Sequence, residues 1–499
     1  MSLKLKITNS NRKYLSIEVL FISIMFDQSF SYLNFRTIFS IELRKGHIDL
    51  NRMPQKYKDA VADIKWLNEE IAKLKRKKRG LWTEAEAKDY KDDMDLLKVV
   101  RDEKEECLTN HLQQIADKVN AHGFNFTMTK SLFENKEVFS VDSTDWAQFF
   151  VMKCLIRNVA KSFNVEMVNR HTVMMNLKLL MNNHMPVFII RTDVSSFFES
   201  IPQKRMMELI ERNSVLSMKS KDMVKRTMKQ YESIKNKTLV AEGVGVPRGI
   251  GISSVLSEIY MLDIDKELKG RREVIFYSRY VDDIFIILSD LGVHRTKEEY
   301  YSQLQKRFAD GYGLTLQPVG SQKCKLLDLS QLGGGTKTEV LTYLGYKMYI
   351  QPSNRKRNTT FGLSDERKQR FKSRVDHVVN RFNNVVKVNI AQAKRDLKDG
   401  LNLITGNIRL TKAKSGVKVG FFYNNDLLDK DEDFQEMEDY LKHIVITVPA
   451  NLFQDANDNA RFEAKVKAYV NGISLRDRWR EKKTYDIGVD RLKEIERWL

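Results

Sequence analysis

Two adjacent aspartates, Asp282 and Asp283, lie between two apolar runs rich in β-forming residues, and no other pattern constrains the fold as much. One run covers residues 275–277 and the other residues 284–288. Successive side chains of a regular strand point to opposite faces, so both carboxylates can serve one site only at the tip of a tight hairpin. No Lys or Arg is adjacent to them in the sequence, so they should repel each other. Mg²⁺, which prefers oxygen ligands, would relieve that repulsion. The alternative is a solvated Asp-Asp turn without a function.

A third aspartate, Asp193, ends another apolar run at residues 187–192. The strand is expected to continue through residues 194–198. Three carboxylates at neighbouring strand ends suit phosphoryl transfer by two metal ions about 3.5–4 Å apart, one activating the attacking hydroxyl and one neutralising the leaving pyrophosphate. The sequence therefore predicts that the three aspartates are catalytic and metal-binding. Two Mg²⁺ ions are expected, with Mn²⁺ as a substitute.

Residues 245–249 (Gly-Val-Pro-Arg-Gly) are rich in glycine and proline, which is typical of a tight turn, and a helical pattern follows at residues 253–261. Together with the two runs that end in aspartates, these segments resemble motifs A, B and C of the reverse transcriptase family in order and spacing.

Two further segments extend the resemblance. Residues 341–346 are similar to the primer-grip hairpin of the family. The grip residues would be Leu344, Gly345 and Tyr346. A strand expected at residues 313–316, followed by Lys323 or Lys325, is similar to motif D.

The resemblance implies a role for several residues. Phe198 occupies the position of the steric gate, whose ring leaves no room for a 2′-hydroxyl and so favours dNTPs. Bulk is needed because a pocket that only lacks a partner for an extra hydroxyl rejects it about a hundredfold. Phe197 is expected to be a core residue, since neighbours on a strand face opposite ways. The other implied residues are Val194 for the metal ions, and Arg170, Arg248, Gly249 and Lys323 for the substrate.

Arg248 departs from the family, because most reverse transcriptases have Gln at this place. Gln both donates and accepts hydrogen bonds, whereas Arg only donates and stays charged. Template and nucleotide would therefore be held differently, which places ordinary templated copying in doubt.

An α+β fold with three parts is predicted. Residues 141–350 would form the fingers and palm of a right-hand polymerase, with an antiparallel palm sheet and helices. Residues 1–140 would be an N-terminal extension, with a helical hairpin at about 55–120. Its first 45 residues are read as a small sheet or a sheet edge. Residues 351–499 would form a mainly α-helical, thumb-like C-terminal domain.

The formal net charge of +19 indicates a polyanionic partner. An RNA template, a DNA product and dNTPs fit that charge. A membrane surface is the competing polyanion, but the apolar stretch at residues 19–26 is far too short to span a bilayer, so neither a transmembrane helix nor a signal peptide is expected. The three cysteines lack metal-type spacing and suit a reducing cytoplasm. The basic run at residues 73–79 is either a nucleic-acid contact or a solvated helix face.

Residues 403–410 and 417–425 resemble a segment that follows the palm in reverse transcriptases of bacterial abortive-infection and antiphage-defence systems. This implies a cytoplasmic bacterial DNA polymerase that copies a companion non-coding RNA, or that starts from one of its own tyrosines without a template. A homo-oligomer is expected. The alternatives are a retron or group II intron reverse transcriptase, or a maturase-like RNA-binding protein with vestigial motifs. The intact aspartates speak against the last alternative.

Overall fold

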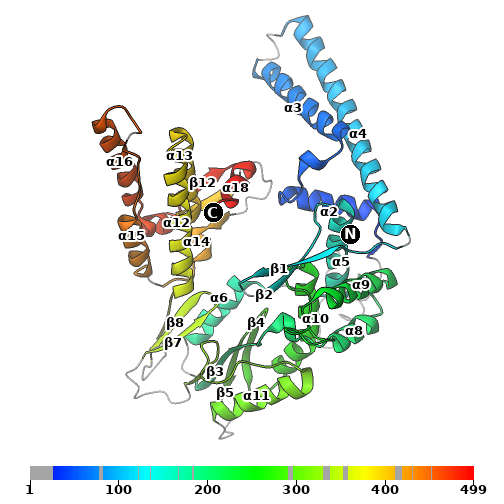
Figure 1. Ribbon diagram of the computed structural model, residues 1–499, viewed down its shortest axis with the longest axis vertical. Coiled ribbons are helices and arrows are strands. Elements are labelled where there is room, and N and C mark those ends of the chain that lie inside the picture. Colours follow the sequence, from blue (N-terminus) through cyan, green and yellow to red (C-terminus); the bar gives the residue numbers. More distant parts are fainter. Residues whose placement is uncertain are drawn as a thin grey trace, which may run out of the picture.

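The computed structural model describes residues 26–77, 82–121, 123–134, 136–166, 168–182, 185–289, 296–329, 338–351, 358–410, 418–429, 431–450 and 452–499. These residues form a mixed fold of helices and small sheets (Figure 1).

The helices are α2 (Tyr32–Arg44), η1 (Leu50–Arg52), α3 (Gln55–Arg76), α4 (Glu84–Asn120), α5 (Trp146–Ser162), α6 (Arg170–Met181), α7 (Phe197–Ser200), α8 (Gln203–Arg212), α9 (Met218–Ile234), α10 (Gly251–Lys269), α11 (Lys297–Tyr312), α12 (Asp365–Val385), α13 (Ile390–Thr405), α14 (Phe421–Asn424), α15 (Asp433–His443), α16 (Ala456–Asn471), α17 (Leu475–Arg480) and α18 (Val489–Glu496). The strands are β1 (Met128–Phe133), β2 (Lys136–Val141), β3 (Val187–Asp193), β4 (Val274–Tyr280), β5 (Asp283–Ser289), β6 (Lys325–Asp328), β7 (Glu339–Tyr343), β8 (Tyr346–Gln351), β9 (Asn358–Leu363), β10 (Asn407–Leu410), β11 (Lys418–Gly420) and β12 (Thr484–Ile487).

The central sheet has four antiparallel strands in the order β4-β5-β3-β6. Alternate residues of β3 and β5 enter two different hydrophobic cores. Phe188 and Ile286 join the core that contains α5 and α10, whereas Ile189 and Phe285 join the core that contains α12 and α13. Because both faces of the sheet are covered, its inner strands read as continuous apolar runs.

The N-terminal region departs from expectation. The first 45 residues were expected to form a small sheet or sheet edge, but residues 32–44 form helix α2. Its buried Phe35, Ile38, Phe39 and Glu42 recur at spacings of three and four, which is the helical period. The aromatic content of this segment suggested strands, whereas the spacing of its buried residues is typical of a helix. Residues 1–25 lie outside the described residues.

Helices α3 and α4 pack against each other as a hairpin that projects from the rest of the chain (Figure 1). Leu67, Ile71, Leu97 and Val100 are buried between them. Thr83 starts α4 with a capping box, since its side chain accepts from the Glu86 backbone and its own N–H donates to the Glu86 carboxylate.

A three-stranded sheet, β7-β8-β9, crosses the expected domain boundary at residue 350, which falls inside β8. The C-terminal part is mainly helical and also contains a sheet in the order β11-β10-β12, in which β10 and β12 are parallel. The segment at residues 403–410 contains the end of α13 and strand β10.

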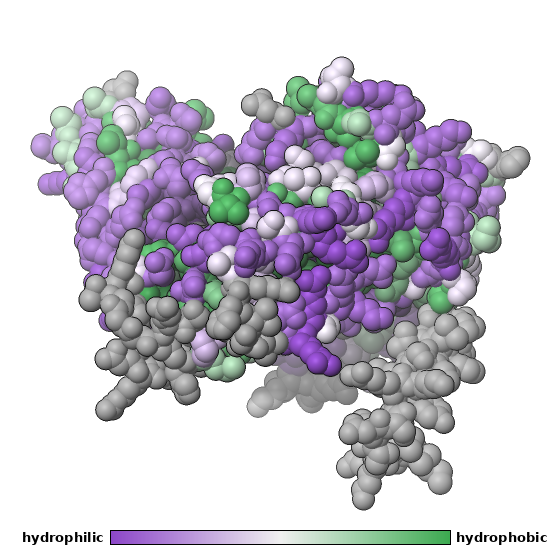
Figure 2. Space-filling model, turned by 90° about the horizontal axis from the view of Figure 1, so that it is seen from below, coloured by the Kyte–Doolittle hydropathy of each residue, from purple (hydrophilic) through white to green (hydrophobic). Residues whose placement is uncertain are grey.

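The face shown in Figure 2 is predominantly hydrophilic, with scattered hydrophobic residues. Across the described ranges, the helices are all too short or too polar to cross a membrane.

Candidate active site

The structure brings the three predicted aspartates together at one end of the central sheet. Asp193 and Asp283 are direct partners across β3 and β5. Tyr280 pairs with Asp283, so Val281 and Asp282 form a two-residue turn between β4 and β5. Asp282 lies at this tip, and its carbonyl accepts from the Val194 backbone N–H at 3.2 Å.

The turn that carries Asp282 has a strained backbone. Val281 has φ +60°, a region that β-branched residues rarely adopt. The buried Arg279 holds this conformation by donating from Nη1 to the Val281 carbonyl at 2.8 Å. Glu258 and Asp265, two carboxylates on α10, lie 2.6 and 2.7 Å from Arg279 Nη2.

Two basic side chains pair with the aspartates and reduce the repulsion expected between them, although neither is adjacent to Asp282 or Asp283 in the sequence. Arg191 Nη2 lies 2.9 Å from Asp283 Oδ1, and Lys323 Nζ bonds Asp193 Oδ2. Arg191 precedes Asp193 by two residues and so shares its face of the strand. Lys323 comes from a segment 130 residues away, so adjacency in the sequence could not reveal it.

Part of the carboxylate cluster nevertheless lacks a partner. Asp193 is 1% exposed, and its Oδ1 has no hydrogen-bond partner within the described structure. Burial raises the pKa of Asp283 to about 6, with Arg191 opposing the rise and Asp282 and Asp193 adding to it. A buried, unsatisfied carboxylate oxygen beside two other carboxylates fits a divalent cation.

Within the ranges that the structure describes, the carboxylates do not form a preformed metal cage. Among the described residues, no three or more His, Cys, Asp and Glu side chains are grouped to hold a metal ion. The two basic side chains occupy carboxylate oxygens that a metal would need, so metal binding would displace them.

The segment expected to resemble motif D is not a strand. α11 ends at Tyr312, Gly313 caps it with φ +62°, and Leu316 makes only a single bridge to Val194. The Ser195 N–H donates to the Thr315 carbonyl at 2.8 Å, which anchors the chain just after Asp193. The side chain of Val194 is a hydrocarbon without a ligand atom, so only its main-chain carbonyl could bind a metal ion.

Phe198 does not lie on a continuation of β3, as expected. The strand ends at Asp193, Ser196 takes φ +47°, and residues 197–200 form the single helical turn α7. Phe197 is buried, as expected, but strand alternation is not the reason. Phe198 is partly buried, and the Arg248 guanidinium lies 5.1 Å from its ring centroid.

Arg248 forms a two-pronged ion pair with Glu199. Its Nε and Nη2 donate to Oε1 and Oε2 at 2.7 and 3.0 Å. The bond to Glu199 raises the pKa of Arg248, and Asp282 adds to that rise. Glu199 thus fixes the guanidinium beside the Phe198 ring and balances its charge inside the protein.

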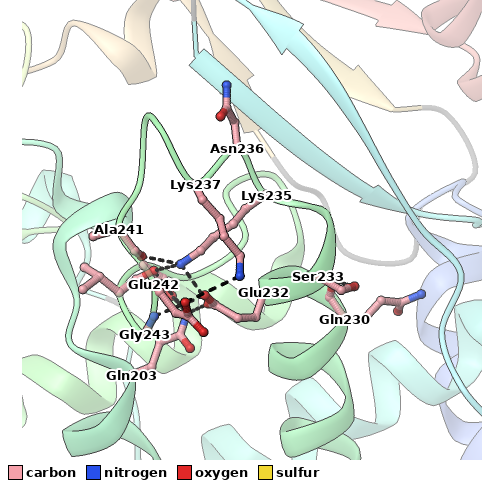
Figure 3. A network of polar contacts seen from close by, with 12 residues as sticks. Gln203, Gln230, Glu232, Ser233, Lys235, Asn236, Lys237, Ala241, Glu242 and Gly243 are labelled. Atoms are coloured by element: carbon pink, nitrogen blue, oxygen red, sulfur yellow. Dashed lines mark hydrogen bonds and ion pairs between the residues drawn. The ribbon is translucent and has the colours of Figure 1, made fainter.

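Arg248 is held between a glycine that follows it and a loop that precedes it and contains a buried lysine. A Cβ on Gly249, which has φ +100°, would lie 2.6 Å from the Phe139 carbonyl of β2. Lys235 Nζ donates to the carbonyls of Ala241 and Val244 at 2.6 and 2.8 Å and pairs with Glu232 (Figure 3). This network fixes the chain that leads into Arg248. α10 follows at Gly251, two residues before the expected start.

The predicted primer-grip residues form a tight turn between β7 and β8. Leu344 and Gly345 both have positive φ, 45° and 78°, as in a type I′ hairpin. Arg170, predicted to bind the triphosphate, donates from Nε to the Leu344 carbonyl at 2.8 Å, and its guanidinium lies 5.5 Å from the Tyr346 ring centroid. The structure therefore places Arg170 against this turn.

Three functional neighbours, Arg191, Glu199 and Arg279, were missed by the sequence analysis. Arg191 and Arg279 are charged residues inside otherwise apolar strands, which is a usable signal, since buried charges require partners. Nothing in the sequence marks Glu199 as the partner of Arg248.

Residues 151–348 match the family described as reverse transcriptase (RNA-dependent DNA polymerase). The chain contains a reverse transcriptase domain. Domains of this family are RNA-directed DNA polymerases, so the domain is that of an enzyme. The matched range includes all three aspartates, Phe198 and Arg248.

Solved structures similar to the chain include telomerases. Telomerase from Candida albicans, in complex with a fragment of telomeric RNA, is 9% identical with a TM-score of 0.32, covering 72% of this chain and 62% of that one. Apo telomerase from Candida tropicalis, truncated from its C-terminal domain, is 15% identical with a TM-score of 0.30, covering 54% of this chain and 70% of that one. The chain thus spans about 62% of the length of the first telomerase. No curated protein matches the sequence.

Proposed function

We propose that the chain is a metal-dependent DNA polymerase that joins dNTPs at Asp193, Asp282 and Asp283. The observation that carries the proposal is the meeting of these carboxylates at the end of β3 and β5, with Asp193 Oδ1 buried and unsatisfied. Two Mg²⁺ ions, or Mn²⁺ in their place, would be held by these carboxylates and the main chain of Val194. When bound, the ions would supply activation of the attacking hydroxyl and neutralisation of the leaving pyrophosphate.

The protein's own groups prepare the site for that chemistry. Arg279 holds the turn that presents Asp282, and Arg191 and Lys323 balance the carboxylates before a metal arrives. Once displaced, the Lys323 ammonium would lie free beside the site and could interact with a phosphate. In this proposal the β4-β5-β3-β6 sheet is the palm, and helices α5 and α6 belong to the fingers.

The steric gate is the second part of the proposal. The Phe198 ring faces the Arg248 guanidinium, and Glu199 fixes that guanidinium, so the ring is held on one side. A fixed ring can exclude a 2′-hydroxyl, which favours dNTPs over NTPs. Arg248 is already paired within the protein, so a contact from it to template or nucleotide would have to be shared with Glu199.

For the biological role we propose antiphage defence in the bacterial cytoplasm, on the resemblance of residues 403–410 and 417–425. Synthesis would copy a companion RNA, or would start from a tyrosine hydroxyl, since a metal activates an oxygen nucleophile whichever molecule carries it. A retron or group II intron type enzyme is the second candidate. It shares the aspartates and would require its own structured RNA.

One experiment separates these possibilities. The purified protein is given labelled dNTPs and Mg²⁺, and the product is run on a denaturing gel after protease or nuclease treatment. Label that migrates with the protein and is released by protease supports tyrosine priming. Label on free nucleic acid that depends on a co-purified RNA supports copying of that RNA. Absence of any incorporation, with or without added primer and template, would contradict the proposed polymerase.

A further inference from the structure

Four arginines line a single cavity of about 240 Å³, and none of the three aspartates is part of its lining. Arg367, Arg370 and Arg374 follow one another at spacings of three and four on α12, so they share one face of the helix. Arg170 is the first residue of α6. The rest of the lining is apolar or carries amide groups and includes Phe371, Phe421, Asn424 and Asn425.

Neutral groups hold two of these arginines in place. Arg170 Nε donates to the Leu344 carbonyl at 2.8 Å, and Arg367 Nη2 donates to the Asn424 carbonyl at 2.7 Å. Both guanidiniums lie near the same Tyr346 ring, 5.5 and 4.9 Å from its centroid. The two cations are therefore brought together by the fold, although they repel each other.

The positive charge of the cavity is not balanced. Within the described part of the chain, none of the four arginines forms an ion pair with a carboxylate, although Arg381 on the same helix α12 pairs with Asp396. Arg170 Nη2 and Arg367 Nη1 are buried without a hydrogen-bond partner among the described residues. Buried, unpaired donors on charged groups are costly, so a fold that keeps them indicates a ligand.

Two acidic groups lie nearby without forming an ion pair with these arginines. Asp433 pairs with Lys368 at 2.6 Å, whereas Asp426 Oδ1 lies 3.4 Å from His171 and is buried without a hydrogen-bond partner among the described residues. Burial lowers the pKa of Arg367, and the adjacent Arg170 lowers it further. Burial also lowers the pKa of Arg374, with Glu496 opposing that effect.

We propose that this arginine cavity is a second anion site, which binds a phosphate group of a polynucleotide backbone. Guanidinium groups donate in a planar fork that matches phosphate oxygens, and several arginines around a small cavity can satisfy all of them. The net charge of +19 favours a polyanion over a small anion. Free pyrophosphate or a nucleotide offers the same chemistry and is the other source of such a group. The site lies outside the proposed catalytic centre and does not depend on its chemistry.

The test is binding by the full chain in EDTA, so that metal-dependent catalysis plays no part. Arg370→Gln/Arg374→Gln is the variant, because neither side chain makes a hydrogen bond or ion pair within the described residues and their loss should not unfold the protein. Arg395→Gln/Arg461→Gln removes the same charge from exposed positions of α13 and α16 and is the control. The probes are a single-stranded DNA or RNA 12-mer, inorganic pyrophosphate and a dNTP.

We expect the variant to bind the 12-mer about tenfold more weakly than the control does, with a shallower dependence of affinity on salt by close to one unit for each lost phosphate contact. Loss of pyrophosphate and dNTP binding alone would support the anion site with a free phosphate as its ligand. If the variant binds all three probes as the control does, the inference is overturned. Arg367→Gln is a second, independent test. Because it removes a buried charge that has no carboxylate partner among the described residues, we expect an unfolding temperature equal to or higher than that of the wild type. The same change should weaken binding of the 12-mer.

Discussion

Arg279 shows how one residue can position a carboxylate that it does not touch. It is 4% exposed, and its guanidinium joins Glu258 and Asp265 of α10 to the carbonyl of the strained Val281. Asp265 and Glu258 raise its pKa above the usual value despite burial, so it stays charged. The tip of the β4–β5 hairpin is therefore fixed to α10 through one side chain.

Replacing Arg279 should be among the most destabilising changes in the chain. Arg279→Met would leave two partly buried carboxylates without their cation, and we expect a loss of about 3–5 kcal/mol in the free energy of unfolding. Arg279→Lys keeps the charge but cannot reach three acceptors at once, so it should lie between Met and wild type. Thermal unfolding measures both. Arg307→Met is the control. It removes an exposed ion-pair partner of Glu267, which lies on α10 together with Glu258 and Asp265. A Met variant as stable as that control would refute the role of Arg279.

Phe198→Ala tests the steric gate. Removal of the ring should open space for a 2′-hydroxyl and raise the use of NTPs relative to dNTPs by at least tenfold, because the remaining discrimination would rest on weak terms. Single-nucleotide incorporation measures the preference. Glu199→Gln, which loosens the Arg248 fork without removing the ring, is the comparison. An unchanged preference in Phe198→Ala would show that the ring is only a packing residue.

Among the elements, α2 is joined to α5 by the buried Glu42. Its carboxylate bonds Lys153 at 2.9 Å, His47 at 2.8 Å and Lys45 at 3.0 Å. Burial alone would raise the pKa of Glu42, but the hydrogen bonds from Lys153, His47 and Lys45 lower it to about 2. A lowered folded-state pKa stabilises the fold above the unfolded-state pKa of about 4.5, and that contribution is lost as the pH falls toward 2.

Glu42→Gln should therefore destabilise the protein by about 2 kcal/mol at pH 7, the scale of charge-assisted hydrogen bonds. The difference from wild type should shrink as the pH falls from 4.5. Unfolding temperatures measured between pH 7 and pH 3.5 would show this. A difference that stays constant over that range would mean that the ion pairs do not stabilise the α2–α5 contact.

The elements also show what a sequence can reveal. The β4–β5 hairpin and β3 as far as Asp193 were predicted correctly, because apolar runs bounded by aspartates indicate strands. The expected continuation of β3 through residues 194–198 was wrong, because the chain turns at Ser196 into α7. α2 was missed because aromatic content was weighed above the spacing of Phe35, Ile38 and Phe39. Lys323 could be associated with a motif but not with Asp193, since the contact joins segments 130 residues apart. The Arg248–Glu199 pair depends on the helical turn α7, which no local pattern indicated.

At the scale of the whole molecule, the excess positive charge should act through particular surfaces. Lys73, Lys75 and Arg76 are exposed at the end of α3 on the projecting hairpin. If they contact phosphates, replacing all three with Gln should flatten the slope of log affinity against log salt by nearly one unit for each contact. Arg461, Lys465 and Lys467 on α16 provide the matched control triple. If the two triple variants show the same slope of log affinity against log salt, the basic run on α3 is a solvated helix face and not a nucleic-acid contact. Lys77 of the same run pairs with Glu86, and Lys78 and Arg79 lie outside the described residues.

The proposed polymerase activity depends on the three carboxylates, so their removal tests the proposal most directly. In Asp282→Asn/Asp283→Asn the amide of residue 283 can still accept a hydrogen bond from Arg191, so the fold should persist. We expect dNTP incorporation by the purified variant to fall at least a thousandfold, with an unfolding temperature within a few degrees of wild type and with 12-mer binding in EDTA retained. Incorporation at the wild-type rate by the folded variant would contradict the assignment of this cluster as the polymerase active site.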